Sequence, residues 1–371
     1  MNILNVNISI DALSGGGTAE RTYQMSRYLA KQNYKCTILT LTSNLTEKNY
    51  EELKNVNLIM LPYLSRRFYL PKGGLKRIRD AVREADVIHL MNHWTFLNAI
   101  VYLFARFYQK PYVVCPAGAL NIFGRSRFIK QFFNRMIGTK IIQNAQGHIA
   151  IAENEFEQYR SYGVDKQQIT LIPNGVVVED FKPEQNRSST LNLPPNYILF
   201  MGRLNYIKGP DLLLEAFAKL PEEYKNYHLV FAGPDEGMKA SLENRAKELQ
   251  LLNNVHFTGS VSGMDKIDAY RGASFLVVPS RKEAMSIVVA EAGVFAKPAL
   301  ITDQCGFDAL EIIQGGYVVP ATAESLAEGL VKIIKEPTKF QMGQNLKQFI
   351  IEHYTWDSVG KKIVRLYETL C

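Results

Sequence analysis

The sequence has few of the features that mark secreted proteins, proteins whose cysteines bind a metal, or membrane-spanning proteins. It contains four cysteines in 371 residues and no C-x-x-C pair, so we expect reduced thiols and no metal site. The cysteines stand far apart, at Cys36, Cys115, Cys305 and Cys371. No apolar run approaches the ~20 residues that span a bilayer, and the first residues lack the charged-then-apolar order of a secretory signal. These absences predict a soluble, cytoplasmic protein.

Nucleic-acid and dinucleotide signatures are also missing, although the charge calls for an anionic partner. The formal net charge is +7, which suits nucleotide phosphates, a lipid headgroup or nucleic acid. No RNP, zinc-finger or helix-turn-helix signature occurs, so we expect no nucleic acid partner. The glycine cluster from Gly15 to Gly17 does not match G-x-G-x-x-G, so a dinucleotide fingerprint is not supported either.

Short apolar runs alternate with helical stretches along the chain. With 47% hydrophobic residues the chain can fill two or three domains, and the alternation predicts parallel sheets covered by helices on both faces. The predicted strands of the first half are 2–10, 36–41, 56–61, 86–90, 112–116, 147–152 and 169–173. Those of the second half are 197–201, 227–232, 255–257, 274–278, 299–302 and 317–319. The polar, proline-containing segment 182–195 between them is typical of a linker.

The predicted architecture is therefore α/β, with two Rossmann-like, doubly wound domains that face each other across a cleft. The first domain covers residues 1–180 and the second residues 196–355. The amphipathic stretch 356–371 is expected to form a helix that packs back across the domain boundary. Because ligands of such sheets bind outside the carboxyl ends of the strands, we expect the functional site in the cleft.

Two carboxylates eight positions apart bracket the start of a predicted helix in the second half. Glu283 precedes a helix expected from Met285 to Phe295, and Glu291 lies roughly two turns inside it. At ~1.5 Å per residue, the pair could hold the two ends of a ligand ~10 Å long, with the free N–H groups of the helix start between them. A sugar nucleotide has this layout. Two solvated glutamates on a helix face would have the same spacing.

Cations and glycines follow the first predicted strand of each half. Arg203 and Lys208 lie directly after the strand of the second half, where two cations suit a diphosphate whose charge grows as its bond to a sugar breaks. Solvated surface cations are the alternative. The cluster from Gly15 to Gly17 opens a helix and lets the backbone approach a phosphate or sugar closely, or it is a plain connecting turn. We expect Arg21 on the more exposed side of that helix.

In combination, these segments resemble the retaining GT-B glycosyltransferases of family 4. The resemblance rests on the Glu283/Glu291 pair, G-R-L-x-x-x-K-G at 202–209, P-N-G-V at 173–176, the first glycine loop and I-T-D-x-C-G-F at 301–307. It implies a GT-B fold and a nucleoside-diphosphate sugar donor, in UDP or GDP form, held mainly by the second domain. It also implies no metal and no other cofactor, and the chain has no Asp-x-Asp motif.

The resemblance also gives roles to individual residues. It implies that Glu283 contacts hydroxyls of the donor sugar, that Glu291 binds the ribose, and that Arg203 and Lys208 bind the diphosphate. Glu283, Arg203 and Lys208 would thus act at the reacting centre. The remaining donor contacts would come from the N–H groups of Met285, Ser286 and Ile287, from Gly15 and Gly16 of the first domain, and from Asn174.

The chain departs from the family at the end of the fourth strand, where relatives commonly carry His-x-His. Here the sequence is His89-Leu-Met-Asn-His93, so that Met91 stands in the place of the second histidine. Either His93 or Asn92 takes over its position near the reacting sugar, or His93 has a structural role at the strand end. We expect His89 to be a buried, hydrogen-bonded strand residue.

Two segments of the first half, 66–79 and 123–135, mix cations with aromatic residues. In the second, Phe128, Phe132 and Met136 share one helical face with Gly124. This composition suits an anionic membrane surface, which a lipid-linked acceptor would require. A core-packed helix with a solvated basic side fits the same pattern.

The sequence thus predicts a retaining, metal-independent hexosyl- or related glycosyltransferase. It would move a sugar to a hydroxyl of a saccharide acceptor, lipid-linked, in the assembly of a cell-surface polysaccharide or glycolipid. The enzyme would be cytoplasmic and peripheral at the inner face of the membrane. The alternatives are another GT-B activity, such as a sugar-nucleotide epimerase, and a non-catalytic sugar-nucleotide or membrane-binding module.

Overall fold

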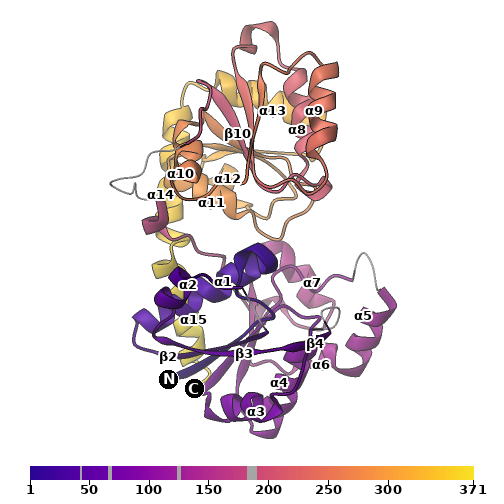
Figure 1. The fold of residues 1–371 in the computed structure, drawn as a ribbon, viewed down its shortest axis with the longest axis vertical. Helices are drawn as coiled ribbons and strands as arrows, with labels where there is room; N and C mark the ends of the chain where they lie inside the picture. The colour runs from indigo at the N-terminus through magenta and orange to yellow at the C-terminus, as the bar shows by residue number, and fades with distance from the viewer. Residues whose placement is uncertain (42–43, 66–68, 123–126, 182–189) are drawn as a thin grey trace. The chain divides into compact units, whose positions relative to one another are not determined.

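The computed structural model describes residues 1–41, 44–65, 69–122, 127–181 and 190–371. Contacts divide the chain into two compact units (Figure 1). Unit 1 consists of residues 1–174 and 356–371, and unit 2 of residues 175–355. The first unit therefore ends at Asn174, six residues before the predicted boundary at 180. More than half of the predicted linker lies outside the described residues.

Unit 1 is built on a parallel sheet with the strand order β3-β2-β1-β6-β7-β8-β9. Its strands are β1 (Asn2–Val6), β2 (Lys35–Leu41), β3 (Val56–Leu61), β6 (Val87–Met91), β7 (Tyr112–Cys115), β8 (Gly147–Ala150) and β9 (Ile169–Leu171). The order reverses at β1, so the connecting helices cover both faces of the sheet. A separate antiparallel pair consists of β4 (Tyr63–Ser65) and β5 (Leu70–Pro71).

The helices of unit 1 are mostly short. They are α1 (Ala12–Lys31), α2 (Glu47–Glu52), α3 (Leu75–Glu84), α4 (Phe96–Phe107), α5 (Arg127–Phe133), α6 (Thr139–Gln143), α7 (Phe156–Arg160) and α15 (Trp356–Glu368). A π-helical turn, Asn134–Gly138, joins α5 to α6, and 3₁₀ turns span Glu153–Glu155 and Lys166–Gln168.

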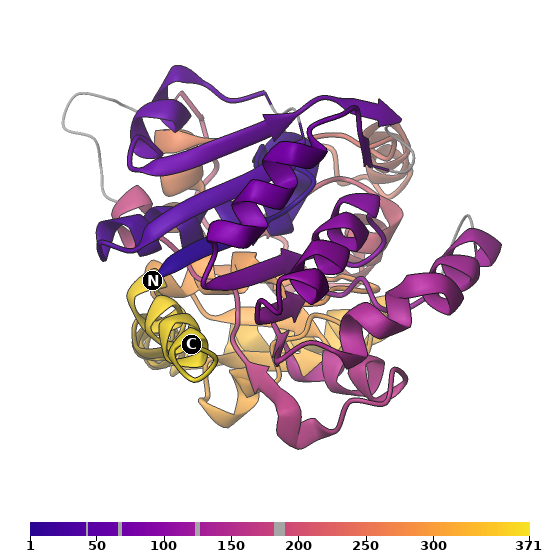
Figure 2. The same cartoon turned by 90° about the horizontal axis from the view of Figure 1, so that it is seen from below.

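The carboxyl-terminal helix α15 belongs to unit 1, although the chain reaches it from unit 2. It lies beside the amino-terminal strand in both ribbon views (Figures 1 and 2). Its Gly360 faces the ring of Tyr28 on α1, where an added Cβ would come within 2.1 Å of the ring. The absence of a side chain at this position is therefore what allows α15 to approach α1 closely.

Unit 2 repeats the arrangement with the strand order β12-β11-β10-β13-β14-β15, again all parallel. Its strands are β10 (Tyr197–Met201), β11 (His228–Ala232), β12 (Val255–Gly259), β13 (Phe275–Val278), β14 (Ala299–Thr302) and β15 (Gly316–Val319). Its helices are α8 (Pro210–Ala218), α9 (Lys239–Glu248), α10 (Gly263–Gly272), α11 (Ile287–Val294), α12 (Ala309–Ile312), α13 (Ala323–Lys335) and α14 (Lys339–His353). Its 3₁₀ turns span Val178–Phe181, Tyr206–Lys208 and Glu222–Tyr224. The prediction of two doubly wound parallel sheets is confirmed.

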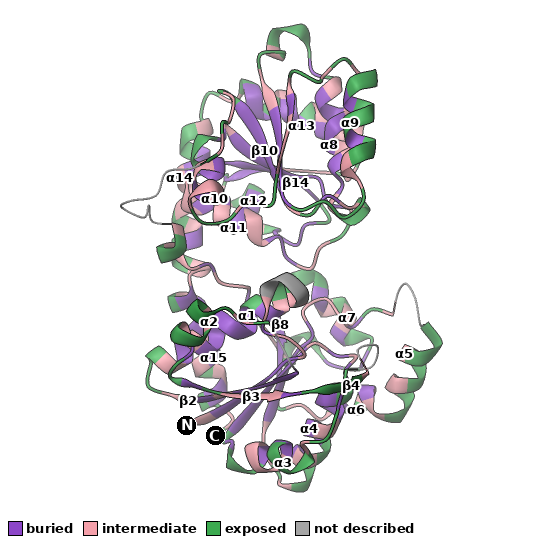
Figure 3. Cartoon of the chain, viewed as in Figure 1, coloured by how far each residue is buried: buried purple, intermediate pink, exposed green. Residues whose placement is uncertain are grey.

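The central strands are buried along their whole length, whereas the helices are exposed on their outer sides (Figure 3). All residues of β6, β10 and β13 are buried. Continuous apolar strands of this kind are expected where helices cover both faces of a sheet. Each unit has its own apolar core, formed by these strands and the inner faces of the helices around them.

Helix α5, like the short helix α2, has no buried residue (Figure 3). The exposed fractions are 87% for Phe128 and 64% for Phe132, and Met136 in the following π-helical turn is 60% exposed. The interpretation of this face as core-packed is therefore wrong. The segments 66–68 and 123–126, which contain Gly124 and two of the predicted cations of the first basic segment, lie outside the described residues.

Candidate active site

In unit 2, Lys208 and Glu283 form an ion pair at the carboxyl ends of neighbouring strands. The ammonium nitrogen of Lys208 lies 2.9 Å from Oε2 of Glu283, and both side chains are largely buried. The other carboxylate oxygen, Oε1, accepts a hydrogen bond from the hydroxyl of Ser280. Lys208 follows β10 and Glu283 follows β13, which pair directly in the sheet. Two residues 75 positions apart are thus brought to one site.

The loop after β10 is shaped to hold Lys208 against the end of β13. Asn205 caps the 3₁₀ turn, and its Oδ1 accepts the N–H of Lys208 at 2.9 Å. Gly209 has a φ of 67°, and a Cβ there would lie 2.1 Å from the carbonyl oxygen of Pro279. Only glycine allows this close approach of the two loops. The G-R-L-x-x-x-K-G pattern therefore has a local structural cause.

The segment from Glu283 to Ser286 is held by the loop after β14 and is not part of the helix. Glu283 N–H donates to Gln304 O at 2.8 Å, and Ser286 N–H donates to Cys305 O at 2.9 Å. Helix α11 therefore begins at Ile287, two residues later than predicted. In this structure the Ser286 N–H already has an acceptor. To bind a diphosphate as predicted, it would have to exchange that bond.

Glu291, in the second turn of α11, is held by two side chains of α10. Lys266 Nζ lies 2.7 Å from Oε1, and the Tyr270 hydroxyl donates to Oε2 at 2.6 Å. Tyr270 is fully buried and stacks on Phe295, while Lys266 lies 5.5 Å from the ring centroid of Phe181. Each oxygen of Glu291 thus has a donor among the described residues, and a carboxylate oxygen has a second lone pair that can accept a hydrogen bond from a ligand.

Arg203 is the more exposed of the two predicted cations, and it is paired with Glu236. Its NH1 lies 2.9 Å from Glu236 Oε1, and Asn205 Nδ2 donates to Oε2 of the same carboxylate at 2.7 Å. The hydrogen bond from Asn205 and then that from Arg203 hold the pKa of Glu236 below its ordinary value. Arg203 would therefore have to leave or share Glu236 to bind a phosphate.

The glycine cluster of unit 1 lies within α1 and not before it. Gly16 has non-helical angles (φ 60°, ψ −149°) that kink the helix near its start. A Cβ on Gly15 would come within 2.6 Å of Ala19, so this position also requires glycine. The helix that runs on to Lys31 therefore begins just after Gly16, close to the predicted start at about 19, and a further helical stretch from residue 12 precedes the kink.

Arg21 is buried, which corrects the expectation that it lies on the exposed side of α1. Only 1% of its surface is exposed. Its guanidinium donates to Ile172 O at 3.1 Å, to Pro173 O at 2.7 Å and to Asn174 Oδ1 at 3.0 Å. A buried charge of this kind must be compensated by hydrogen bonds. Arg21 therefore fixes the P-N-G-V segment that contains the predicted site residue Asn174.

The His89–His93 region places its polar side chains at different depths. His89 is buried, with Nδ1 2.5 Å from the Tyr367 hydroxyl, and burial lowers its pKa to about 3. His93 is 1% exposed, its Nε2 lies 2.9 Å from Asn134 Oδ1, and burial lowers its pKa to about 4. Asn92 is partly exposed and donates to Asn7 Oδ1 at 2.7 Å. The role of His93 near a reacting sugar stays a prediction, and its ring is shielded from solvent in this structure.

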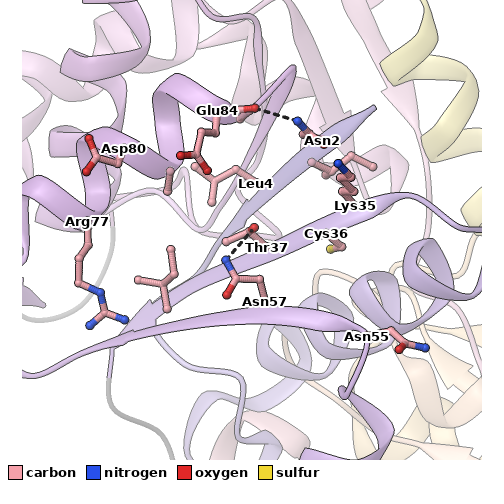
Figure 4. A pocket seen from close by; sticks show the side chains of 14 residues that line it. Asn2, Leu4, Lys35, Cys36, Thr37, Asn55, Asn57, Arg77, Asp80 and Glu84 are labelled. Atoms are coloured by element: carbon pink, nitrogen blue, oxygen red, sulfur yellow. Dashed lines mark hydrogen bonds between the residues drawn. The ribbon is translucent and has the colours of Figure 1, made fainter.

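A pocket of about 640 Å³ in unit 1 lies elsewhere (Figure 4). It is lined by Asn2, Lys35 and Asn57 at the amino-terminal parts of β1, β2 and β3, and by Arg77 and Asp80 of α3. None of the predicted site residues lines it. It is thus at the opposite ends of the strands from the predicted site.

Sequence reasoning missed the partners of the predicted residues. Four residues contact a predicted site residue or its loop: Glu236, Lys266, Tyr270 and the buried Arg21. No spacing pattern in the sequence connects these four residues with the residues that they contact. Within the described residues, no three His, Cys, Asp or Glu side chains are grouped as a metal ion would require. No described helix has the length and apolar character needed to cross a membrane.

Two family models match the chain in succession. Residues 15–180 match the model described as Glycosyltransferase Family 4, and residues 181–363 match the one described as Glycosyl transferases group 1. An uncharacterized glycosyltransferase of Methanocaldococcus jannaschii is 29% identical over 220 residues, 56% of this chain and 55% of the relative. The O-antigen chain mannosyltransferase C of Escherichia coli is 24% identical over 386 residues, 100% and 99% of the two chains. The chain spans about half the length of several of the curated relatives it matches, as with the first of these.

Solved structures with the same fold include HepE of Anabaena in complex with UDP, with a TM-score of 0.78 and 16% identity over 100% of both chains. A complex of HepE with UDP-glucose superposes with a TM-score of 0.73 at 15% identity, again over 100% of both chains. Sucrose-phosphate synthase from Thermosynechococcus elongatus has a TM-score of 0.75 at 20% identity, over 100% and 99% of the chains. At these identities the likeness shows the fold. Both family models match in order along the chain, and each unit is built on a parallel, doubly wound sheet. The chain therefore belongs to the family 4 glycosyltransferases and has their GT-B fold.

Proposed function

We propose that the protein is a retaining glycosyltransferase that moves a sugar from a UDP- or GDP-linked donor to a hydroxyl of a saccharide acceptor. The observation that carries this proposal is the Lys208–Glu283 pair at the carboxyl ends of β10 and β13. A cation and a carboxylate side by side suit the junction of a sugar and a diphosphate. The lysine neutralises phosphate charge, and the carboxylate accepts hydrogen bonds from sugar hydroxyls.

The donor is a nucleotide sugar in this proposal. Glu291, held by Lys266 and Tyr270, presents acceptor lone pairs to the ribose hydroxyls. The solved structures of HepE contain UDP and UDP-glucose, and their fold is that of this chain. We take the same class of donor for this protein. Neither a metal ion nor another cofactor is part of the proposed reaction, because Lys208, Arg203 and the helix N–H groups supply the positive charge.

In the proposed step, the anomeric configuration is retained because of the face on which the acceptor attacks. The bond from the anomeric carbon to the diphosphate oxygen breaks, and the acceptor hydroxyl attacks the same face of the sugar. The leaving diphosphate takes the acceptor proton, so the products are a glycoside and a nucleoside diphosphate. Lys208 and Arg203 stabilise the negative charge that grows on the diphosphate. No nucleophilic carboxylate is required in this step.

The acceptor is a lipid-linked saccharide used in cell-surface polysaccharide or glycolipid assembly. In support, the full-length match to the mannosyltransferase of Escherichia coli is to an enzyme of the O-antigen chain. The exposed side chains Phe128, Phe132 and Met136 lie among the cations Arg127 and Arg135. An apolar stripe bordered by cations suits the surface of an anionic membrane, where such an acceptor would be found.

A screen of nucleotide sugars tests the proposal. UDP-glucose, UDP-galactose, GDP-mannose and the free nucleotides are added to the protein, and thermal stabilisation is measured together with release of the nucleoside diphosphate. At least one donor should raise the unfolding temperature, since a ligand of the folded state stabilises it, and should be turned over when alkyl glycosides are present. Stabilisation without turnover would favour a non-catalytic binding module. Conversion of the nucleotide sugar to its epimer without an acceptor would favour an epimerase.

A further inference from the structure

Three consecutive residues of the loop after β7 are held by side chains from other parts of unit 1. We call residues 116–120 the β7 loop. Ala117 and Gly118 both have left-handed backbone angles, with φ of 49° and 82°, so the loop turns sharply. The hydrogen bonds that hold it run from Gly118 N–H to Glu155 Oε1, from Trp94 Nε1–H to Ala119 O and from the Tyr162 hydroxyl to Leu120 O.

Glu155 joins this loop to the neighbouring strand. It is 1% exposed, and its second oxygen, Oε2, accepts the N–H of Ile151 at 2.7 Å, directly after β8. Each oxygen of the carboxylate therefore accepts one backbone N–H. An ionised carboxylate only accepts hydrogen bonds, whereas a protonated one carries an O–H donor. Protonation would set that donor against one of the two N–H groups, so the ionised form is the one that holds both.

The surroundings of Glu155 bring its ionisation close to neutral pH. Burial raises its pKa to about 7, while the N–H groups of Ile151 and Gly118 and the charge of Arg21 act in the opposite direction. The other titratable groups that face it are Cys115 on β7 and Tyr159 on α7. Burial raises the pKa of Cys115 to about 11 and that of Tyr159 further above its ordinary value. Both stay neutral at pH 7, and Arg21 is the charged neighbour.

The β7 loop lies beside the loop that carries the predicted reactive residues of unit 1. Asn92 N–H donates to Cys115 O at 3.1 Å, and β6 and β7 pair in the sheet. Trp94, which donates to the β7 loop, directly follows His93. These two loops leave the carboxyl ends of adjacent parallel strands, which is where ligands of such sheets bind.

We propose that Glu155 is a positioning residue for the acceptor, which holds the β7 loop through Gly118 in the arrangement that receives the acceptor sugar. This inference rests on the proposed function. In the ionised state of Glu155 the loop is fixed, and the acceptor hydroxyl meets a preformed surface. When Glu155 is protonated or replaced by glutamine, one of its two backbone bonds is lost and the loop shifts.

A fluorescence titration tests the loop without any substrate. The chain contains two tryptophans, so in Trp356→Phe the emission comes from Trp94, whose indole contacts the β7 loop. We expect this emission to change with pH with a midpoint near 7, and the change to vanish when Glu155→Gln is added. Glu157→Gln is the matched control, because Glu157 is exposed and pairs with Arg160. An unchanged titration in Glu155→Gln, or no titration in Trp356→Phe, would overturn the proposal.

Kinetics test the role in transfer. With a donor found in the screen and octyl glycosides as acceptors, Glu155→Gln should raise the acceptor KM about tenfold or more, because the acceptor no longer meets a preformed surface. Thermal stabilisation by the donor nucleotide should persist, since that site is in unit 2. An acceptor KM equal to that of Glu157→Gln would refute the role. If no donor binds the wild type, the proposed function fails. The fluorescence titration would still test whether Glu155 holds the β7 loop.

Discussion

The ammonium nitrogen of Lys208 lies 2.9 Å from Oε2 of Glu283, and this pair ties the loop after β10 to the loop after β13. Because Ser280 occupies the other oxygen of Glu283, the carboxylate is fixed in orientation before any ligand arrives. A carboxylate held in this way is already oriented for a ligand. The pair is therefore the centre of the proposed donor site.

Replacing Lys208 should remove much of the stabilisation of the leaving diphosphate. We expect Lys208→Ala to lower kcat by ~10²-fold or more, on the scale of losing one electrostatic stabiliser, and Arg203→Ala to do the same. Steady-state release of the nucleoside diphosphate measures both. Lys219→Ala is the control, because Lys219 forms an exposed ion pair with Glu324 in the same unit. Wild-type turnover in the Lys208 and Arg203 variants would remove both residues from the site.

Glu291 should act in donor binding and not in the chemical step. Lys266 and Tyr270 of α10 hold Glu291 in place, and in the proposed function it binds the ribose. Because the ribose takes no part in the bond changes, we expect Glu291→Gln to raise the donor KM with little change in kcat, the pattern of lost uniform binding. Tyr270→Phe keeps the stacking on Phe295 and should raise the donor KM less. Initial rates at varied donor concentration separate the two constants, and a fall in kcat alone for Glu291→Gln would contradict the assignment.

Arg21 should stabilise the end of unit 1. Arg21→Met leaves the buried carbonyls of Ile172 and Pro173 without their donor, which costs about 1–3 kcal/mol for such groups. Urea unfolding should show this loss, and amide hydrogen exchange should become faster at 172–176. Arg27→Met is a matched control on the same helix, where the ion pair with Glu52 is partly exposed. Equal stability and equal exchange in both variants would contradict a clamping role for Arg21.

The pH dependence of stability should carry the signature of Glu155. Its pKa in the folded protein is raised to about 7, above its ordinary value. A raised pKa means that its contribution to stability is fully present below the ordinary value and is lost as the pH rises to about 7. Hence, as the pH rises from 5 to 8, the unfolding free energy of the wild type should fall relative to that of Glu155→Gln. A difference that stays constant over this range would contradict the burial-induced shift.

Helix α5 should bind anionic membranes. Phe128 and Phe132 together expose large apolar surfaces next to cations, so we expect co-sedimentation with vesicles of phosphatidylcholine and phosphatidylglycerol that weakens as salt is added. A double variant, Phe128→Ser with Phe132→Ser, should bind at least roughly tenfold more weakly, given the apolar area lost. Phe340→Ser, an equally exposed phenylalanine of unit 2, is the control. Absence of binding at low salt would refute the membrane role.

The strand pattern of the sequence predicted both sheets, because strands buried on both faces must be continuously apolar. The first strand was predicted too long for a physical reason. Ile8 and Ile10 continue the alternation, but the side chain of Asn7 donates to Thr18 O and to the Thr22 hydroxyl, and β1 ends at Val6. The start of α11 was missed in a similar way, since long-range backbone bonds to Gln304 and Cys305 compete with helix formation.

The candidate site could be predicted in its residues but not in its pairings. Motif order placed Lys208 and Glu283 after the right strands, yet their ion pair depends on β10 and β13 being neighbours in the sheet. Arg21 was misjudged because charged side chains are usually exposed, and its acceptors are carbonyls some 150 positions away. No sequence motif marks Glu155, because its partners are backbone N–H groups, which every residue type except proline has.

Turnover of a nucleotide sugar by the wild type and by Lys208→Ala tests the central claim most directly. In parallel assays with UDP- and GDP-sugars and alkyl glycoside acceptors, we predict release of nucleoside diphosphate and an α- or β-glycoside of the same anomeric configuration as the donor. The Lys208→Ala variant should be slower by ~10²-fold or more. Inversion of the anomeric centre, or equal rates in the two proteins, would contradict the account.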